Sequence, residues 1–584
     1  MDRLISTIIY VGLVIVEIVG FTMTSSSLLA QTPSFVWADK AEATSDISPN
    51  GIAVDSSGNI YVAGWFFRGV ATFGSVTLVD SSYHSTFLVK YDSSRNPVWA
   101  VSAGGSGGDR ARAVAVDRFG NVYIGGYFYD SVYFGSTLLQ VGRNGDGFYV
   151  VKLSNAGSVL WARSADASGE FCGLATDTDG NVYVTASFVQ DTCFFFGSSM
   201  FLLKSPGAYE NLLVAKYTST GDVVWARSAS GYWNRGYSMA LDALGNSYIT
   251  GFFIGDSIAF GSTVLLNHGS ADFFVAKHNA DGTLLWARSA GGATSDFGNS
   301  VAVDRAGGCF VTGVGDFVFG PDTVRASLFI VRYDSSANES WARSVGSYQT
   351  FDVGYAVVAD YLGNSFVAGS IYDNTVYLAK YNLNGDLVWA KTPNGGAATG
   401  IALDQLGGTY TTGYFNNATI QLDTITLYNN HWPPPLPNDM FVGKIGTPGS
   451  QASVRLTFYH QIHEIPYYQT PLAIAAGGST AKICADGSSS TIISCDLDSG
   501  NVYGMRMRIR ENLNGDSTAV YGFFTLIPES TTTNRLLFRY HHPIIPPPRA
   551  SQTRHLTFEV IDSLINRLVA TNPVDIYRTP VLMI

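Results

Sequence analysis

Acidic residues at a fixed spacing from glycine are the first candidates for chemistry in this sequence. An aspartate stands three residues before a glycine at seven places: Asp55, Asp117, Asp177, Asp242, Asp304, Asp360 and Asp404. Carboxylate oxygens are ligands that calcium prefers. These residues are spread along the chain rather than gathered, and an aspartate that opens a tight turn accepts hydrogen bonds from its own following backbone. We therefore interpret them as turn residues and predict no metal site there.

A second candidate for chemistry is the group His460, His463 and Glu464, whose spacing would suit zinc on a helix. The surrounding residues are typical of a strand, which places His460 and His463 on opposite faces. No third ligand follows from the sequence, and the pair His541 and His542 is no better placed. Acidic residues fall mainly in the repeated turns, so no converging pair of carboxylates is evident. The sequence predicts no metal, no cofactor and no enzyme activity.

Aromatic residues beside arginine and asparagine form the third group of candidates. They lie in links between successive repeats: Arg110, Arg112, Tyr232, Trp233, Asn234, Arg235 and Tyr348. Such residues suit stacking on sugars or anchoring of a protein. We predict that they bind a glycan or a protein ligand. The alternative is that these side chains only fill the rim between neighbouring repeats.

The five cysteines matter because the chain begins like a secreted protein. Arg3 precedes an apolar run over residues 4–21, and small residues end at Ala30, which is typical of a signal peptide spanning residues 1–30. A retained membrane anchor is the alternative, because the run is near spanning length. We expect a protein that is secreted or held at the cell surface, without membrane contact after cleavage. Disulfides are then permissible.

Two disulfides are predicted from cysteine positions. Cys172 and Cys193 fall in two links of one repeat at the same rim, and Cys484 and Cys495 bracket a short Gly/Ser loop. Cys309 lies in a strand and is interpreted as a small buried hydrophobe.

The elements that position these residues are short strands that recur along the chain. In the second complete repeat the strand-like runs cover residues 113–117, 121–128, 148–153 and 158–164. A Trp-Ala pair marks the fourth strand at Trp37, Trp99, Trp161, Trp225, Trp286, Trp341 and Trp389. A basic residue marks the third strand at Lys90, Lys152, Lys216, Lys277, Arg332, Lys380 and Lys444. We expect these basic side chains to pair between repeats or to extend along apolar surface toward water.

The strands at which the repeat array begins and ends predict a closed ring. Trp37 marks a fourth strand with no earlier strands, and Lys444 marks a third strand with no successor. An N-terminal strand over residues 35–41 would complete the last sheet and remove two exposed edges. The sequence thus predicts an all-β fold, a seven-bladed β-propeller over residues 31–446. The second-to-third and fourth-to-first links would share one rim, and we expect the ligand at this loop-rich rim.

Three motifs in register carry a resemblance to a known family. Segments such as Gly180-Asn181-Val182-Tyr183-Val184-Thr185, Phe134-Gly135-Ser136 and Trp161-Ala162-Arg163-Ser164 resemble the bacterial β-propeller repeat called SBBP. The resemblance covers roughly residues 35 to 446. It implies a secreted or surface propeller with binding or scaffold roles.

The composition changes at residues 446–450, which indicates a linker. Strand-like runs follow, and they predict a small β-sandwich-like domain over residues 447–584. The segments 482–487 and 572–584 resemble the β-domain and first core strand of secreted α/β-hydrolases. The alternative function is therefore the targeting front of an esterase or lipase whose catalytic domain is missing from this chain.

Charge and composition narrow the partners. The net charge is -11, and no run of Lys and Arg is present, which argues against nucleic acid. We predict a monomeric, non-catalytic propeller that binds a glycan or protein. A propeller lyase or glycosidase and a structural spacer are the remaining alternatives.

Overall fold

The computed structural model describes two parts of the chain. The first covers residues 33–446, except 106, 142–144, 167–168, 190–191, 197–200, 205–208, 347–351, 361, 373, 405–406, 430 and 432–436. The second covers the strands at 454–461, 490–497, 505–513, 516–524, 531–532, 535–541, 554–562 and 567–576. Every regular element in these residues is a β-strand, which confirms the predicted all-β class. None of the described residues belongs to a helix with the length and apolar character needed to cross a membrane.

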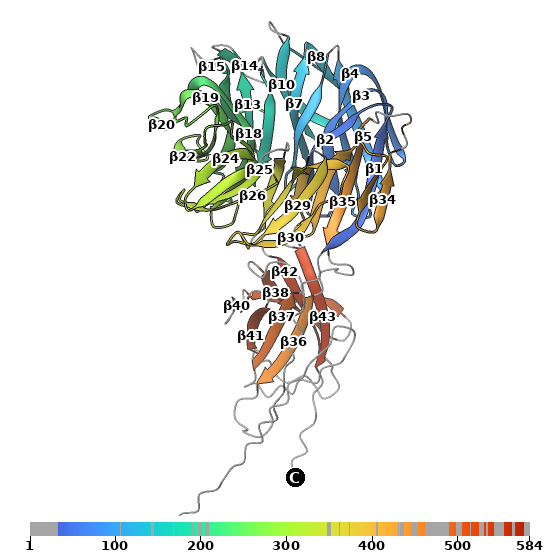
Figure 1. Ribbon diagram of the computed structural model, residues 1–584. Helices are drawn as coiled ribbons and strands as arrows, with labels where there is room; N and C mark the ends of the chain where they lie inside the picture. Colours follow the sequence, from blue (N-terminus) through green and yellow to red (C-terminus); the bar gives the residue numbers. More distant parts are fainter. Residues whose placement is uncertain are drawn as a thin grey trace, which may run out of the picture.

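The first part of the chain consists of antiparallel sheets, and each successive set of four main strands in them is here called a blade (Figure 1). Blade 1 contains β2 (Ile47–Val54), β3 (Ile60–Phe73), β4 (Val76–Tyr91) and β5 (Pro97–Gly105). Blade 2 contains β6 (Arg110–Val116), β7 (Val122–Tyr129), β10 (Asp146–Leu153) and β11 (Val159–Asp166). Blade 3 contains β12 (Phe171–Thr176), β13 (Val182–Phe188), β16 (Asn211–Tyr217) and β17 (Val223–Ser228). Blade 4 contains β18 (Ser230–Leu241), β19 (Ser247–Phe260), β21 (Asp272–His278) and β22 (Leu284–Ala290).

The remaining blades follow the same order. Blade 5 contains β23 (Phe297–Val303), β24 (Cys309–Phe319), β25 (Asp322–Tyr333) and β26 (Glu339–Val345). Blade 6 contains β27 (Val353–Ala359), β28 (Ser365–Ile371), β29 (Thr375–Tyr381) and β30 (Leu387–Lys391). Blade 7 contains β31 (Gly396–Leu403), β32 (Thr409–Phe415), β35 (Asp439–Gly446) and, as its fourth strand, β1 (Ser34–Ala43).

The N-terminal strand closes the ring. β1 pairs antiparallel with β35 from Ser34 opposite Gly446 to Ala41 opposite Met440. The two ends of the repeat array therefore lie side by side in blade 7. This pairing satisfies two sheet edges that a linear array would leave open.

The links between second and third strands form hairpins rather than open loops. They contain β8 (Ser131–Phe134) with β9 (Thr137–Gln140), β14 (Thr192–Phe196) with β15 (Phe201–Lys204), β20 (Thr263–Leu266), and β33 (Thr419–Leu422) with β34 (Ile425–Tyr428). β8 pairs with β5 of the preceding blade, β14 pairs with β11, and the long strand β3 reaches β1. The phenylalanine of the Phe-Gly motif is buried at Phe73 and Phe134. These hairpins cover outer sheet edges, so the parts of the links that form them are not open loops at the rim.

The end of each blade away from these hairpins carries the turn between the first and second strands. This polar turn is repeated in every blade, and we call it the turn end. In blade 2 one oxygen of Asp117 accepts hydrogen bonds from the backbone N–H of Phe119 and of Asn121, both at 2.9 Å. The other oxygen accepts from Asn121 Nδ2 at 2.8 Å and lies 3.0 Å from the Tyr123 hydroxyl. Related bonds recur at Asp55, Asp177, Asp242, Asp304, Asp360 and Asp404. The aspartates are thus engaged by their own turns, as turn chemistry requires.

The basic residue of the third strand completes this turn. Lys152, Lys216, Lys277, Arg332, Lys380 and Lys444 each form an ion pair with the turn aspartate of their own blade. Lys90 instead donates to Asn155 of the next blade. The expectation of pairing between blades is therefore wrong for most of these ion pairs. The second and third strands are neighbours in one sheet, which brings the cation over the turn of its own blade.

Contacts between blades come from the Trp-Ala-Arg motif. The indole Nε1 atoms of Trp99, Trp161 and Trp225 donate to backbone carbonyls of the next blade at 3.0 Å. Arg163 and Arg227 donate to the Gly221 and Gly282 carbonyls beside them. With the corresponding bond from Trp341 to the Leu383 carbonyl, the motif links blades 1, 2, 3 and 5 to the third-to-fourth turn of the next blade.

The second part of the chain contains two further antiparallel sheets. One joins β36 (Val454–Gln461), β37 (Ser490–Leu497), β41 (Arg535–His541) and β40 (Thr531–Thr532). The other joins β39 (Asp516–Phe524), β38 (Met505–Leu513), β42 (Arg554–Asp562) and β43 (Arg567–Ile576). Two sheets are consistent with the predicted sandwich. The resemblance to a hydrolase front stays a prediction, since residues 482–487 and 577–584 lie outside the described residues.

Candidate functional site: the axial pocket

A β-bulge occurs at the same position in the first strand of every blade. The pairing with the second strand skips Asn50, Arg112, Cys172, Tyr237, Asn299, Tyr355 and Thr399. A bulge leaves the extra residue out of the ladder and turns its side chain away from the regular alternation. The first strands are the innermost strands of a propeller, so these positions surround its axis.

Small residues beside the bulges allow the blades to approach one another at the axis. A Cβ on Gly354 would lie 2.1 Å from Thr312 Oγ1 of the preceding blade, and one on Gly298 would lie 2.2 Å from Thr250 Oγ1. The small residue in the second strand is required for a similar steric reason. A Cβ on Gly251 would lie 1.8 Å from the Arg235 carbonyl oxygen of the paired first strand.

Six of the seven bulge residues line a cavity of about 530 Å³, which we call the axial pocket. Its lining comes from every blade: Ser48, Asn50, Arg112, Glu170, Phe171, Tyr237, Phe297, Asn299, Tyr355, Thr399 and Tyr414. Ser48, Glu170 and Phe297 precede the bulges by two residues, toward the links that enter each blade. The volume falls within the range of small-molecule sites. Segments distant in the sequence thus build a single concave site.

One side of the axial pocket is charged. Glu170 Oε2 lies 3.7 Å from Arg112 Nη2 and 3.4 Å from Arg235 Nη1. Arg235 Nε donates to Glu210 Oε1 at 2.6 Å, and the Glu210 side chain is only 2% exposed. Burial alone would lower the pKa of Arg235, but the hydrogen bond and charge of Glu210 outweigh it and raise that pKa. The positive charges of the two arginines therefore cancel the negative charges of the two glutamates on this side of the pocket, which blades 2, 3 and 4 form.

The other side of the axial pocket is aromatic and neutral. Phe297, Tyr355 and Tyr414 line it from blades 5, 6 and 7. Burial, together with the nearby Tyr414, raises the pKa of Tyr355 to about 12, so its hydroxyl stays protonated at neutral pH. Among the polar bulge residues, Asn299 Nδ2 donates to the Gly354 carbonyl at 3.0 Å and Thr399 Oγ1 to the Pro49 carbonyl at 2.7 Å. These bonds cross from one blade to the next and hold the side chains in place.

The structure brings together some of the predicted ligand-binding residues. Arg112 lines the axial pocket, and Arg235 joins it through the ion pair with Glu170. Arg110 instead stacks on Trp65, with 4.3 Å from its guanidinium carbon to the ring centroid. It also lies 3.2 Å from His84 Nε2, and burial together with Arg110 lowers the pKa of His84 to about 4.

The remaining predicted ligand-binding residues have different surroundings. Asn234 is fully buried, and its Oδ1 accepts a hydrogen bond from the backbone N–H of Leu212 at 2.7 Å. Trp233 packs against Tyr209 with ring centroids 5.2 Å apart. Tyr232 is 59% exposed. Tyr348 lies outside the described residues.

The predicted disulfide between Cys172 and Cys193 is not formed. Cys193 is a free thiol, and it is fully buried in the apolar cluster that contains Phe195 and Tyr217. Its strand, β14, belongs to a hairpin that packs against blade 2 instead of crossing the rim toward the first strand of blade 3. Cys309 is also a free, fully buried thiol, as predicted. The Cys484–Cys495 prediction lies outside the residues whose side chains are described.

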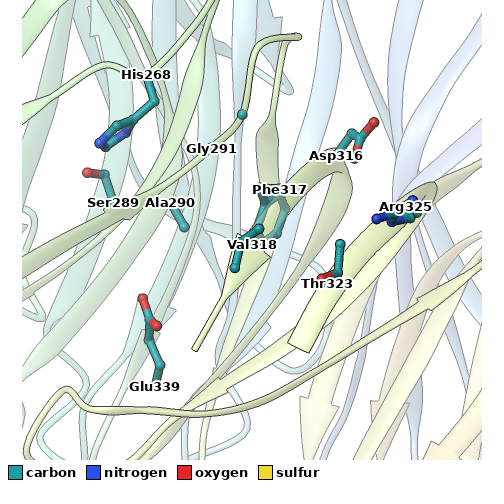
Figure 2. A pocket seen from close by; sticks show the side chains of 11 residues that line it. His268, Ser289, Ala290, Gly291, Asp316, Phe317, Val318, Thr323, Arg325 and Glu339 are labelled. Carbon is teal, nitrogen blue, oxygen red and sulfur yellow. The ribbon is translucent and has the colours of Figure 1, made fainter. Parts of the chain in front are cut away.

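A second cavity of about 820 Å³, the lateral pocket, lies between blades 4 and 5 (Figure 2). His268 and Ser289 face it from blade 4, and Arg325 and Glu339 from blade 5. His268 Nδ1 lies 2.7 Å from Asp272 Oδ2, an arrangement that also orients catalytic histidines. A looser contact of the same residue types occurs in blade 7, where His431 Nε2 lies 3.4 Å from Asp439 Oδ1, again at the first residue of the third strand. We therefore interpret it as a repeated structural contact.

Histidine, cysteine and acidic residues do not gather into a metal site within the described residues. Sequence reasoning missed the pocket residues Tyr237, Asn299, Tyr355 and Thr399 because they stand inside strands. A signal does exist. Each is a larger residue between two small ones within a first strand, as in Gly236-Tyr237-Ser238 and Gly298-Asn299-Ser300.

Comparisons with known proteins agree with the architecture. Residues 41–65 match the family described as SBBP, Beta-propeller repeat. An uncharacterized WD repeat-containing protein of Acanthamoeba polyphaga mimivirus is 24% identical over 432 residues, which cover 62% of this chain and 30% of that protein. The match therefore spans about a third of the viral protein's length. The chain is thus similar to propeller repeat proteins.

Two solved structures resemble the chain distantly. The full extracellular region of plexin A4 has 8% identity and a TM-score of 0.32, with 94% of this chain and 62% of that chain covered. An apocarotenoid oxygenase of Synechocystis has 10% identity and a TM-score of 0.33, with 69% of this chain and 95% of that chain covered.

Proposed function

We propose that this protein is a secreted or cell-surface, non-catalytic propeller that binds a neutral glycan in its axial pocket. The observation that carries the proposal is the pocket itself, to which every blade contributes, six of the seven through their bulge residue. The repeat supplies the same backbone geometry around the ring. The side chains at that position differ from blade to blade, which is the property expected of a binding site on a rigid scaffold.

The lining favours a sugar over other small ligands. Tyr237, Tyr355 and Tyr414 offer aromatic faces with polar edges, which suit a ring that is apolar on one side and hydroxylated around its rim. Asn50, Asn299 and Thr399 add amide and hydroxyl groups. The charges of Arg112, Arg235, Glu170 and Glu210 balance, so a neutral ligand meets no unpaired charge.

The absence of catalysis is part of the proposal. The carboxylates nearest the pocket, Glu170 and Glu210, are both paired with arginine. Of these two carboxylates only Glu170 is among the lining residues of the pocket, whereas glycosidases place a pair of carboxylates on either side of the bond that they cleave. We expect the protein to bind glycans without cleaving them.

A glycan array with the mature chain tests the proposal. We expect binding to neutral glycans and its loss on replacing Tyr237 and Tyr355 with alanine. Tyr428→Ala serves as the matched control, because Tyr428 is 60% exposed on an outer hairpin. Retention of binding by the double variant, or binding only to proteins, would overturn the axial site as a glycan site. Product formation from a bound glycan would overturn the non-catalytic assignment.

A further inference from the structure

Two exposed tyrosines form an aromatic pair next to the charged side of the axial pocket, since Tyr209 precedes Glu210 in the chain and Tyr232 shares a strand with Arg235. The rings of Tyr209 and Tyr232 are stacked, with centroids 6.2 Å apart and an interplanar angle of 29°. Both are more than half exposed, at 56% and 59%. We call this pair the tyrosine platform.

The tyrosine platform is held rigidly by the backbone. Tyr209 N–H donates to the Tyr232 carbonyl at 2.7 Å, and Asn234 N–H donates to the Glu210 carbonyl at 3.0 Å. Trp233 supports the platform from beside Tyr209, at 5.2 Å between ring centroids. Exposed aromatic rings that are fixed before binding lose little conformational entropy when a ligand stacks on them.

A continuous set of contacts joins the platform to the axial pocket. Tyr232, Arg235 and Tyr237 lie on one strand, β18. Arg235 pairs with Glu170, which lines the pocket, and Tyr237 lines it directly. At about 3.3 Å per residue, Tyr232 and Tyr237 are roughly 15 Å apart along the strand. That span exceeds the length of a single sugar ring.

We propose that the tyrosine platform is a second subsite, and that the ligand is an unbranched oligosaccharide whose end fills the axial pocket. The chain then runs along β18, and its more distant sugars stack on Tyr232 and Tyr209. This inference rests on the proposed function. It adds a length requirement, since a disaccharide fills the pocket without reaching the platform, whereas a hexasaccharide engages both.

Titration calorimetry with cello-, malto- and xylo-oligosaccharides tests the inference. Within the series that binds, we expect the hexasaccharide to bind more tightly than the disaccharide. Tyr232→Ala should weaken hexasaccharide binding about five- to tenfold and leave disaccharide binding unchanged. Tyr209→Ala should act in the same direction, and Tyr428→Ala should change neither.

The possible outcomes distinguish a failure of the second subsite from a failure of the proposed function. Equal affinity for both lengths, or an equal effect of Tyr232→Ala on both, would overturn the second subsite and leave the axial pocket standing. No binding of either length in any series, with a folded protein, would contradict the proposed function instead. Thermal unfolding of each variant shows whether the protein is folded.

Discussion

The two ends of the propeller use the same repeat for opposite purposes. At the turn end, similar residue types occupy the same positions in successive blades and make similar hydrogen bonds and ion pairs. Asp117, Asn121 and Lys152 of blade 2 are examples. At the axial end, the bulge position holds asparagine, arginine, cysteine, tyrosine, asparagine, tyrosine and threonine in turn. A position that repeats serves a local need of every blade. A position that varies on a fixed backbone is available for recognition.

The largest expected effect is the loss of a turn carboxylate. Asp117 is fully buried at its side chain, accepts hydrogen bonds from Phe119 and Asn121, and faces Lys152. Asp117→Ala leaves that cation and those donors without their acceptor, and we expect a loss of about 3–5 kcal/mol in unfolding free energy. Denaturant unfolding measures it.

The matched control for this change is Asp179→Ala in the next blade. Asp179 is 78% exposed and lies 3.9 Å from Arg118, so we expect little change in unfolding free energy. Equal losses for the two variants would contradict the role assigned to the turn end.

Stability should depend on pH through carboxyls near the start of the first strands. Burial raises the pKa of Asp109 to about 7 and that of Asp296 to about 6, above the value of about 3.9 expected in the unfolded chain. The folded protein then holds protons that the unfolded chain has released. The contribution of these two carboxyls to the unfolding free energy should fall as pH rises from about 4 to about 7, by about 1.4 kcal/mol for each unit by which a pKa is raised. His84 and His278, whose pKa values burial lowers to about 4, contribute in the opposite direction. The difference in unfolding free energy between wild type and Asp109→Asn isolates the Asp109 contribution: it should change with pH over this range, and a constant difference would exclude Asp109 as a source.

A smaller effect is expected from charge at the axial end. Glu170 is 39% exposed at its side chain and separates Arg112 from Arg235. Glu170→Gln leaves an excess of positive charge at the pocket. We expect affinity for acidic glycans to rise about five- to tenfold over wild type, measured on the same array, with a melting temperature close to that of wild type. A rise of equal size on Asp179→Gln would indicate a general charge effect.

The sequence predicted the repeated features well because they depend on local chemistry. The Asp-x-x-Gly turn and the Trp-Ala strand each follow from neighbouring residues, and counting these repeated markers reveals the missing strand of the last blade. The axial pocket could not be predicted in the same way. Tyr237 and Tyr355 come together only because separate blades bring their bulges to one axis. The hairpins within the second-to-third links could not be predicted either, since the edge that β8 covers belongs to another repeat.

The cysteine prediction failed for a related reason. Cys172 and Cys193 were placed on one rim by their positions in the repeat. The hairpin that carries Cys193 packs instead on the preceding blade, and its thiol is buried among aromatic residues. Repeat position therefore indicates where a link begins, but the surface it covers depends on tertiary packing.

The most direct test of the account applies one substitution, tyrosine to leucine, at each end of the ring and measures both stability and glycan binding. Tyr123 is fully buried at the turn end, with its hydroxyl 3.0 Å from Asp117 Oδ2 and from the Gly180 carbonyl. Tyr355 is 37% exposed at the axial pocket. Tyr123→Leu should lower the unfolding free energy by about 2–4 kcal/mol and leave the dissociation constant unchanged. Tyr355→Leu should weaken binding at least about tenfold and change the unfolding free energy by less than about 1 kcal/mol. The reverse pattern, or losses of both properties in both variants, would contradict the division between a stabilising end and a binding end.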